Sequence, residues 1–359
     1  MEGRRYFTIF LFFVTNSIYS QQSWYKSYHG FIDTCPVTMH LNKATHDYFG
    51  YYFYDLYQDP IYFTGEDTSE KGAIKLTSFL PDQTISESFF FQVKDSSITG
   101  KWYTNSSKAL SFSAKQRRSL LSFDFISTHG TIKLRPKMTG SPGATYEAAS
   151  VWPKGNSIQE IFLKKSFNEM FGIKNSTDDI GKVFLQQKKQ YFDGYIKTNK
   201  NLKNEEIRDN ETYDYDQSDQ IMVVFQSSAL LTLAKFSSSY TGGAHGNYGT
   251  LFTSVDLVNN KKLRLDDVIT IGGQMQLSKL LEKYFRKTYS LKDTDSLTEG
   301  GLFGNQIEPN NNFYVTAKGI GFNYLPYEIG PFAMGEINIF IPFSELNNYL
   351  QPSFRKIID

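Results

Sequence analysis

Residues 89–102 read FFFQVKDSSITGKW, and this stretch decides the fold of the amino-terminal part of the chain. Phe89–Val93 and Ile98–Trp102 are rich in the aromatic and β-branched residues that favour half-buried strands. The Asp95-Ser96 pair between them is typical of a turn. The stretch therefore predicts two short antiparallel strands joined by a hairpin.

Similar short runs continue on both sides of this hairpin, from about residue 28 to residue 112. Turn-forming residues such as Asp59-Pro60, Gly65 and Gly72 separate them. Strands of this length and spacing, without helical periodicity, predict an antiparallel β-meander that can curl into a small barrel. We assign residues 21–115 to this β-rich domain, and we expect the aromatic residues of 51–57 to serve chiefly as its core.

The composition limits the classes of partner. The chain has 359 residues, which suggests two domains, and its 38 Lys and Arg nearly balance its 37 Asp and Glu. Because nucleic acid and anionic membranes select strongly basic surfaces, a net charge of +1 argues against both as the main partner. Hydrophobic residues make up 40% of the chain, which argues against intrinsic disorder over most of its length.

Residues 1–20 have the pattern of a signal peptide: Arg4 and Arg5 precede an apolar run that is too short to span a bilayer. No later run is long enough to form a transmembrane segment. We therefore expect an exported protein, periplasmic or extracellular. The single cysteine, Cys35, excludes an intramolecular disulfide, and we expect a buried free thiol there, with an intermolecular disulfide as the alternative.

The character of the sequence changes after residue 115. Apolar residues recur at helical spacing over 157–171 and over 178–196, and these segments predict amphipathic helices. Residues 198–220 are highly charged and predict a solvated surface loop. Strand-like runs follow, and a further helix is expected after Gly272-Gly273, with Met275 among its inward-facing residues. Residues 116–359 therefore predict an α+β domain.

Two strings of this domain stand out. Residues 240–249 read YTGGAHGNYG, where four glycines permit positive φ angles and close backbone approach. Residues 322–335 read FNYLPYEIGPFAMG, and 263–268 (LRLDDV) and 341–346 (IPFSEL) accompany them. Taken together, the strings resemble a bacterial extracytoplasmic domain family over about residues 145–350. That family forms the outer half of the lysozyme-sensing anti-sigma-V factor and is appended to some peptidoglycan deacetylases.

The resemblance implies an α+β fold, an antiparallel sheet with helices on one face, and an extracytoplasmic location. The best-understood member of the family binds lysozyme as a receptor and performs no chemistry itself. This chain has neither an anti-sigma segment nor a deacetylase domain with metal ligands, so sigma-factor regulation and deacetylation are not implied. What the resemblance implies is recognition of a lysozyme-like protein or of a cell-wall glycan such as peptidoglycan.

A surface formed by the two loops is the candidate binding site. Pro326 and Pro331 restrict the shape of the second loop, which presents aromatic residues suited to recognition. The expected ligand-binding residues are Tyr240, Thr241, Gly242, Gly243, His245, Asn247, Tyr327, Glu328 and Phe332.

The alternative function is a cell-envelope hydrolase in which His245 acts with Glu328 or Asp256. Glu328 and Glu336 could also form the paired carboxylates of a glycosidase. No Gly-x-Ser-x-Gly nucleophile motif is present, so we expect a binding or structural role for His245. The five histidines show no metal-ligand spacing apart from His40 and His46, and we expect neither a metal nor a cofactor. A purely structural role for the β-meander remains a third possibility.

Overall fold

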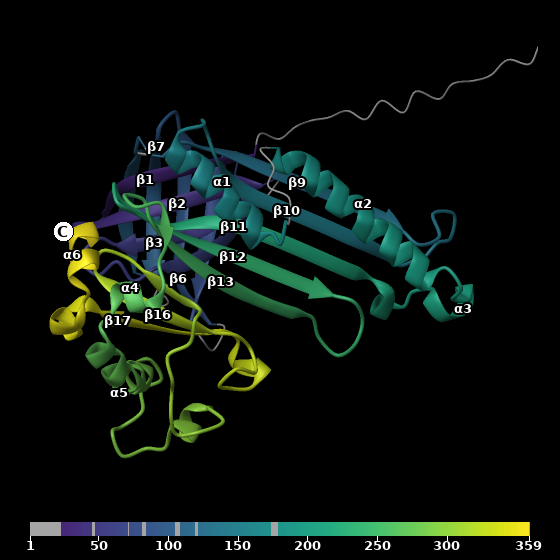
Figure 1. The fold of residues 1–359 in the computed structure, drawn as a ribbon. Coiled ribbons are helices and arrows are strands. Elements are labelled where there is room, and N and C mark those ends of the chain that lie inside the picture. The colour runs from purple at the N-terminus through teal and green to yellow at the C-terminus, as the bar shows by residue number, and fades with distance from the viewer. Residues whose placement is uncertain are drawn as a thin grey trace, which may run out of the picture.

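The computed structural model of the chain describes residues 23–44, 47–70, 72–80, 84–104, 108–118, 121–173 and 179–358. Its strands form a closed barrel, a six-stranded sheet and a three-stranded sheet, and helices accompany the two sheets (Figure 1). The predicted α+β class is confirmed. The predicted signal peptide, residues 1–20, lies outside the described residues.

Eight antiparallel strands close into the amino-terminal barrel, because β1 pairs with both β2 and β8. The strands are β1 (Trp24–Ile32), β2 (Cys35–Ala44), β3 (Asp47–Tyr54), β4 (Ile61–Asp67), β5 (Ala73–Phe79), β6 (Ile85–Lys94), β7 (Ser97–Thr104) and β8 (Ala109–Gln116). In the hairpin formed by residues 89–102, Phe89 pairs with Trp102 and Lys94 with Ser97. The predicted meander or small barrel is thus confirmed as a barrel.

The barrel interior is a packed core, rich in aromatic rings. Its buried side chains are Tyr28, Ile32, Val37, Met39, Leu41, Tyr48, Tyr52, Phe63, Ile74, Leu76, Phe89, Phe91, Ile98, Trp102, Phe112 and Ala114. One carboxylate, Glu87, accepts hydrogen bonds from the Tyr52 hydroxyl and from Trp102 Nε1, the latter at 3.0 Å. Burial raises the pKa of Glu87.

Two side chains of the barrel differ from the expectation, although Tyr51, Tyr52 and Phe53 are core residues as expected. Tyr57 lies in the loop after β3 and is 65% exposed, whereas Tyr51 and Tyr52 are buried as expected. The Cys35 thiol is free but exposed. Cys35 is the first residue of β2, next to the turn after β1, and so it lies at the end of the strand rather than in the packed core.

The second sheet has the strand order β14-β13-β12-β11-β10-β9. Its strands are β9 (Phe123–Lys133), β10 (Gly143–Pro153), β11 (Tyr215–Gln226), β12 (Leu230–Tyr240), β13 (Asn247–Asp256) and β14 (Lys261–Lys262). Every pair is antiparallel except β10 with β11. That pair is parallel because helices α1 (Ile158–Met170) and α2 (Ile180–Asn199) connect the two strands.

The predicted surface loop at 198–220 contains regular structure. It includes the short helices α3 (Asn204–Ile207) and η1 (Glu211–Tyr213) and the start of β11 at Tyr215. Ile207 is fully buried and packs near Tyr195 of α2. Leu202, Tyr213 and Tyr215 pack in the same cluster, so a few apolar residues hold this charged segment against the rest of the protein.

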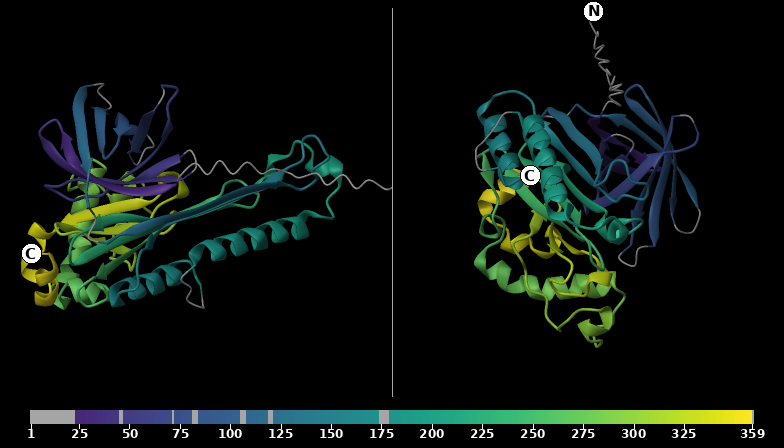
Figure 2. Two further views of the ribbon diagram at one scale, coloured as in Figure 1. Left: turned by 90° about the horizontal axis from the view of Figure 1, so that it is seen from above. Right: turned by 90° about the vertical axis from the view of Figure 1, so that its right-hand side faces the viewer.

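The six-stranded sheet is covered on both faces (Figure 2). Ile221 and Val223 of β11 pack in one cluster with residues of α1 and α2. The alternating residues Met222 and Val224 pack with Phe49 and Tyr51 on the outer surface of the barrel. Successive side chains of a strand point to opposite faces, so every residue from Ile221 to Phe225 is buried. Helices on one face were expected, whereas the barrel on the other was not.

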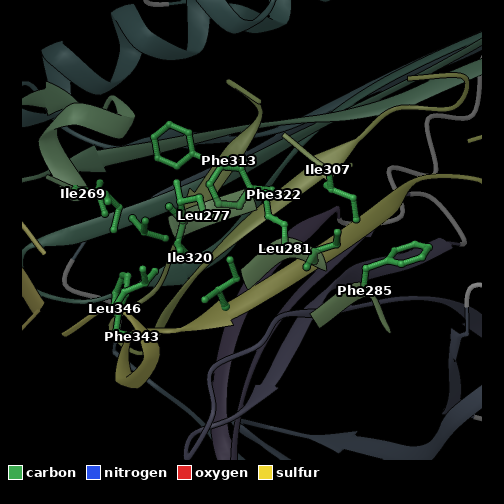
Figure 3. Close-up of a cluster of buried hydrophobic side chains, with 14 of the residues drawn as sticks. Ile269, Leu277, Leu281, Phe285, Ile307, Phe313, Ile320, Phe322, Phe343 and Leu346 are labelled. Atoms are coloured by element: carbon green, nitrogen blue, oxygen red, sulfur yellow. The ribbon is translucent and has the colours of Figure 1, made fainter. Parts of the chain in front are cut away.

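The three-stranded sheet consists of β15 (Phe313–Val315), β16 (Gly319–Tyr324) and β17 (Ile337–Pro342), in that order. Helix α5 (Ile271–Thr288) packs on it through Leu277, Leu281 and Phe285, which face Phe313, Ile320 and Phe322 of the strands (Figure 3). The remaining elements are α4 (Leu265–Val268), η2 (Leu297–Gly300), η3 (Phe332–Met334), η4 (Phe343–Glu345), η5 (Asn347–Tyr349) and α6 (Pro352–Ile358). Among the described residues, no helix combines the length and apolar character needed to cross a bilayer.

Candidate functional site

The two distinctive strings of the sequence meet in space. Residues 241–246 connect β12 to β13, and residues 325–336 connect β16 to β17. The His245 ring stacks on Phe332 with 4.0 Å between ring centroids, and Tyr248 contacts Phe332 edge-on at 5.6 Å. His245 Nε2 lies 3.2 Å from the Tyr327 hydroxyl. We call these four residues the aromatic loop cluster.

Hydrogen bonds assign the tautomer of His245. Its Nδ1 lies 2.8 Å from the carbonyl oxygen of Gly246, which can only accept, so Nδ1 carries the proton and donates. Nε2 of the neutral ring is then the acceptor for the hydroxyl proton of Tyr327. Both ring nitrogens are engaged, and the stacked Phe332 fixes the plane of the ring. The arrangement therefore presents His245 in one defined orientation at an exposed position.

The glycines of the first loop give it its shape. Gly242 and Gly243 have φ angles of +93° and +104°, which favour glycine over other residues. The Tyr240 hydroxyl donates to the Gly243 carbonyl at 3.0 Å and braces the turn. Thr241 and Asn247 are exposed beside it. Of these expected ligand-binding residues, Tyr240 and the two glycines shape the loop, whereas Thr241 and Asn247 border the cluster.

The second loop presents Tyr327 and is braced by Glu328. Tyr327 is 56% exposed and has a left-handed backbone, with φ of +70°. The Glu328 carboxylate accepts from the backbone N–H of Leu325 and from Asn310 Nδ2, both at 2.8 Å. Glu328 therefore closes the turn that carries Tyr327 and ties it to Asn310, which precedes β15.

Among the described residues, no hydrogen bond or ion pair joins His245 to Asp256, Glu328 or Glu336. Asp256 is buried at the opposite end of β13, about 30 Å away at the usual rise per residue of a strand. It accepts from the backbone N–H of Val258 and of Asn259, at 2.9 and 3.0 Å. Glu336 accepts from the backbone N–H and the hydroxyl of Thr250, and burial raises its pKa.

Metal binding has no support in the part of the chain that the structure describes. No group of three or more His, Cys, Asp or Glu side chains is arranged there to hold an ion. His40 is buried against the Tyr25 hydroxyl, whose oxygen lies 2.8 Å from Nδ1. His46 lies outside the described residues.

Sequence reasoning missed two features of this region. Tyr248 belongs to the aromatic loop cluster, and the only signal for it was an aromatic residue among the loop glycines. A cavity of about 1480 Å³ lies between the barrel and the two sheets, with Tyr51, Tyr248 and Glu336 among its lining residues. Its walls come from segments far apart in the sequence, so no local pattern could have indicated it.

Comparison with known proteins places the second loop within a described family. Residues 266–344 match the model of the family described as "Protein of unknown function (DUF3298)". The match includes α5, all three strands of the smaller sheet and Tyr327, but it does not reach the loop with His245. No curated protein matches the chain.

Two solved structures are also similar to this chain. A crystal structure of a DUF3298 family member from Bacteroides fragilis is 26% identical, with a TM-score of 0.58, and the alignment covers 67% of this chain and 98% of that one. A DUF3298 family protein from Pseudomonas aeruginosa is 18% identical, with a TM-score of 0.48, over 65% of this chain and 95% of that one. Residues 266–344 of this chain are therefore similar to the DUF3298 family.

Proposed function

We propose that this chain is an exported, non-enzymatic binding protein that recognises a lysozyme-like protein through the aromatic loop cluster. One observation carries the proposal: His245, Tyr327 and Phe332, from two loops about 80 residues apart in the sequence, converge into one exposed cluster. Side chains held in fixed orientations lose little conformational entropy on binding, and Tyr is common among the residues that dominate protein interfaces. The choice of partner rests on the resemblance to the lysozyme-sensing family.

The geometry supports binding better than hydrolysis. An acid–base mechanism at His245 needs a carboxylate within hydrogen-bond reach, directly or through one water. Each of these carboxylates already accepts hydrogen bonds within the chain: Glu328 from Leu325 and Asn310, Glu336 from Thr250, and Asp256 from Val258 and Asn259. The imidazole nitrogens are engaged by Gly246 and Tyr327. These contacts suit a rigid recognition surface.

Calorimetric titration of residues 21–359 against a c-type lysozyme tests the proposal. We expect saturable binding, and we expect His245→Ala and Tyr327→Ala each to weaken it by about 10- to 30-fold, as is usual for residues that anchor an interface. Phe90→Ala is the matched control, because Phe90 is also an exposed aromatic residue but lies on the barrel. Circular dichroism establishes that each variant is folded.

Three outcomes contradict the proposal in different ways. Equal affinity of wild type and both loop variants would remove the aromatic loop cluster as the binding surface. Absence of heat with folded protein, followed by saturable binding of peptidoglycan fragments, would replace the protein partner with a glycan. Turnover of peptidoglycan that His245→Ala abolishes would favour the hydrolase instead.

A further inference from the structure

The large cavity is bounded by all three sheets of the molecule. The barrel contributes the end of β3, the loop after it and the start of β4, and the six-stranded sheet contributes residues of β12 and β13. The three-stranded sheet, α5 and α6 complete the wall. Its volume, about 1480 Å³, exceeds the range of roughly 300 to 1,000 Å³ typical of small-molecule sites. The space can therefore hold an organic molecule of substantial size.

Exposed apolar side chains of the barrel gather in this cavity. The large hydrophobic side chains that are exposed and also line it are Leu56, Tyr57, Tyr62, Phe79 and Leu80. Apolar side chains scattered singly over a surface are ordinary, whereas a contiguous group in a concave site is typical of ligand binding. The ring of Tyr62 lies 5.4 Å from that of Tyr51, so part of this wall is a continuous aromatic surface.

One carboxylate in the cavity has no partner among the described residues. Asp59 follows Gln58, whose backbone is left-handed at φ of +55° and whose side chain accepts from the backbone N–H of Ala317 at 3.0 Å. Pro60 restricts the backbone on the other side of Asp59. These contacts place the exposed side chain of Asp59 in the lining of the cavity.

The surroundings of Asp59 leave its negative charge poorly compensated. Its side chain is exposed to the cavity, and partial desolvation by the surrounding protein raises the pKa of its carboxyl to about 7. Lys287, Lys318 and Arg355 also line the cavity, but none forms an ion pair with Asp59. The other acidic residue of the lining, Glu336, is hydrogen-bonded to Thr250. A cationic ligand would supply the ion pair that Asp59 does not form within the chain.

We propose that the cavity between the barrel and the two sheets binds an amphipathic small molecule carrying an ammonium group, with the ammonium at Asp59 and the apolar part against Tyr57 and Tyr62. The faces of aromatic rings attract cations, and a carboxylate beside them adds a charge-assisted contact. The apolar part gains from covering the exposed side chains of the barrel wall. Tyr248 of the aromatic loop cluster also lines this cavity, but Asp59, Tyr57 and Tyr62 lie outside the cluster, and the ammonium site does not depend on the function proposed for it.

Three probes with one alkyl chain and different headgroups test the site in the full mature chain. Decyltrimethylammonium, decyl maltoside and decyl sulfate are titrated calorimetrically below their micellar concentrations. We expect the ammonium compound to bind about tenfold more tightly than either of the others, because the carboxylate of Asp59 and the face of an aromatic ring both attract the cation. In Asp59→Asn that preference should fall to about twofold or less, while maltoside binding stays as in wild type.

Two further variants test the aromatic ring and provide a control outside the cavity. Tyr57→Leu retains an apolar side chain but removes the ring face, so it should weaken ammonium binding and spare maltoside binding. Asp95→Asn makes the same carboxyl-to-amide change in the β6–β7 turn, outside the cavity, and should leave the preference intact. Tighter binding of decyl sulfate, equal binding of all three probes, no binding of any, or an unchanged preference in folded Asp59→Asn would each overturn the proposal.

Discussion

Tyr327 has a left-handed backbone at an exposed position, although it is neither glycine nor asparagine. Residues with a Cβ atom adopt this conformation at a cost of about 1 to 2 kcal/mol. The turn persists because Glu328 accepts from the N–H of Leu325 and from Asn310. Backbone strain of this kind is frequent at functional sites, which agrees with the role we propose for Tyr327.

The strain at Tyr327 leads to a stability prediction. Tyr327→Gly and Tyr327→Ala remove the same ring contacts, but only glycine is free of the Cβ penalty. We expect the glycine variant to be more stable to unfolding in urea than the alanine variant, by about 1 kcal/mol. This reverses the usual order, in which glycine is the less stable because its unfolded chain has more freedom.

Thr241 is the matched control for this order. It is also an exposed loop residue beside the aromatic loop cluster, but it does not have a positive φ. Thr241→Gly should be less stable than Thr241→Ala. If alanine is the more stable replacement at both positions, the left-handed backbone of Tyr327 costs little and the argument from strain is wrong.

Two adjacent glycines of helix α5 have different packing environments. Gly272 and Gly273 are neighbours in its first turn. A Cβ atom on Gly272 would come no closer than 3.9 Å to Tyr349, an ordinary contact, whereas one on Gly273 would lie 2.4 Å from Tyr349 Cβ and 2.6 Å from Ile269 Cγ2. Gly273 therefore allows α5 to approach the segment that carries Tyr349.

The two glycines of α5 serve as each other's control. We expect Gly272→Ala to stabilise the protein by up to about 1 kcal/mol, because alanine loses less backbone entropy in a helix. Gly273→Ala should destabilise it by about 1 to 3 kcal/mol, because the packing must shift to admit a methyl group. Thermal unfolding of the two variants measures the difference, and equal midpoints would refute the close approach.

Elements with a strong local pattern were predicted well. The stripes at 157–171 and 178–196 correspond to α1 and α2, within two or three residues at the described ends. The prediction for α5 was less accurate, because Met275 was expected to face inward and is 75% exposed. Leu277, Leu281 and Phe285 already supply the buried stripe of this helix. The hydrophobicity pattern of a helix does not show how much of its surface the neighbouring elements cover.

The whole molecule is held together by the contact between barrel and sheet, and His40 lies in that contact. Tyr25, whose hydroxyl oxygen lies 2.8 Å from His40 Nδ1, contacts Phe123 of β9, and Phe53 beside His40 contacts Phe225 of β11. Burial lowers the pKa of His40 to about 3, and the charge of Arg117 acts in the same direction. His40 therefore stays neutral in the folded protein down to low pH.

Because the pKa of His40 is lower in the folded chain than in the unfolded chain, the stability of the protein depends on pH. Above pH 6.5, His40 is neutral in both the folded and the unfolded chain, and its contribution to stability is complete. As the pH falls from about 6.5 toward 3, the unfolded chain binds a proton that the folded chain excludes. The free energy of unfolding should then decrease by up to about 1.4 kcal/mol per pH unit from this residue.

Urea unfolding of His40→Phe across this pH range measures the contribution. We expect the variant to lose less stability than wild type between pH 6.5 and 4, because it has no imidazole to protonate. Tyr25→Phe is the control: it should lower stability at every pH, through the lost hydrogen bond, without changing the slope. Parallel curves for wild type and His40→Phe would contradict a buried neutral histidine.

The sequence by itself determined the local structure: the hairpin at 89–102, the strand succession that closes into a barrel, and the helices of 157–196. The hydrophobic periodicity and the turn-forming residues of a segment indicate where its own side chains point. Both depend only on residues that are close together in the sequence. The two loop strings were also recognisable, because four glycines and two prolines leave a distinct pattern.

Only the tertiary structure decided what each face contacts. The barrel covers one face of the six-stranded sheet, which buries both sides of β11 and the side chain of His40 and leaves the cavity that Asp59 lines. It also brought His245 to Phe332 and kept Asp256 far from both. Such contacts depend on how whole sheets stack on one another to bury apolar surface. The free energy of that burial is the sum of many weak interactions between distant segments, so no single segment determines it.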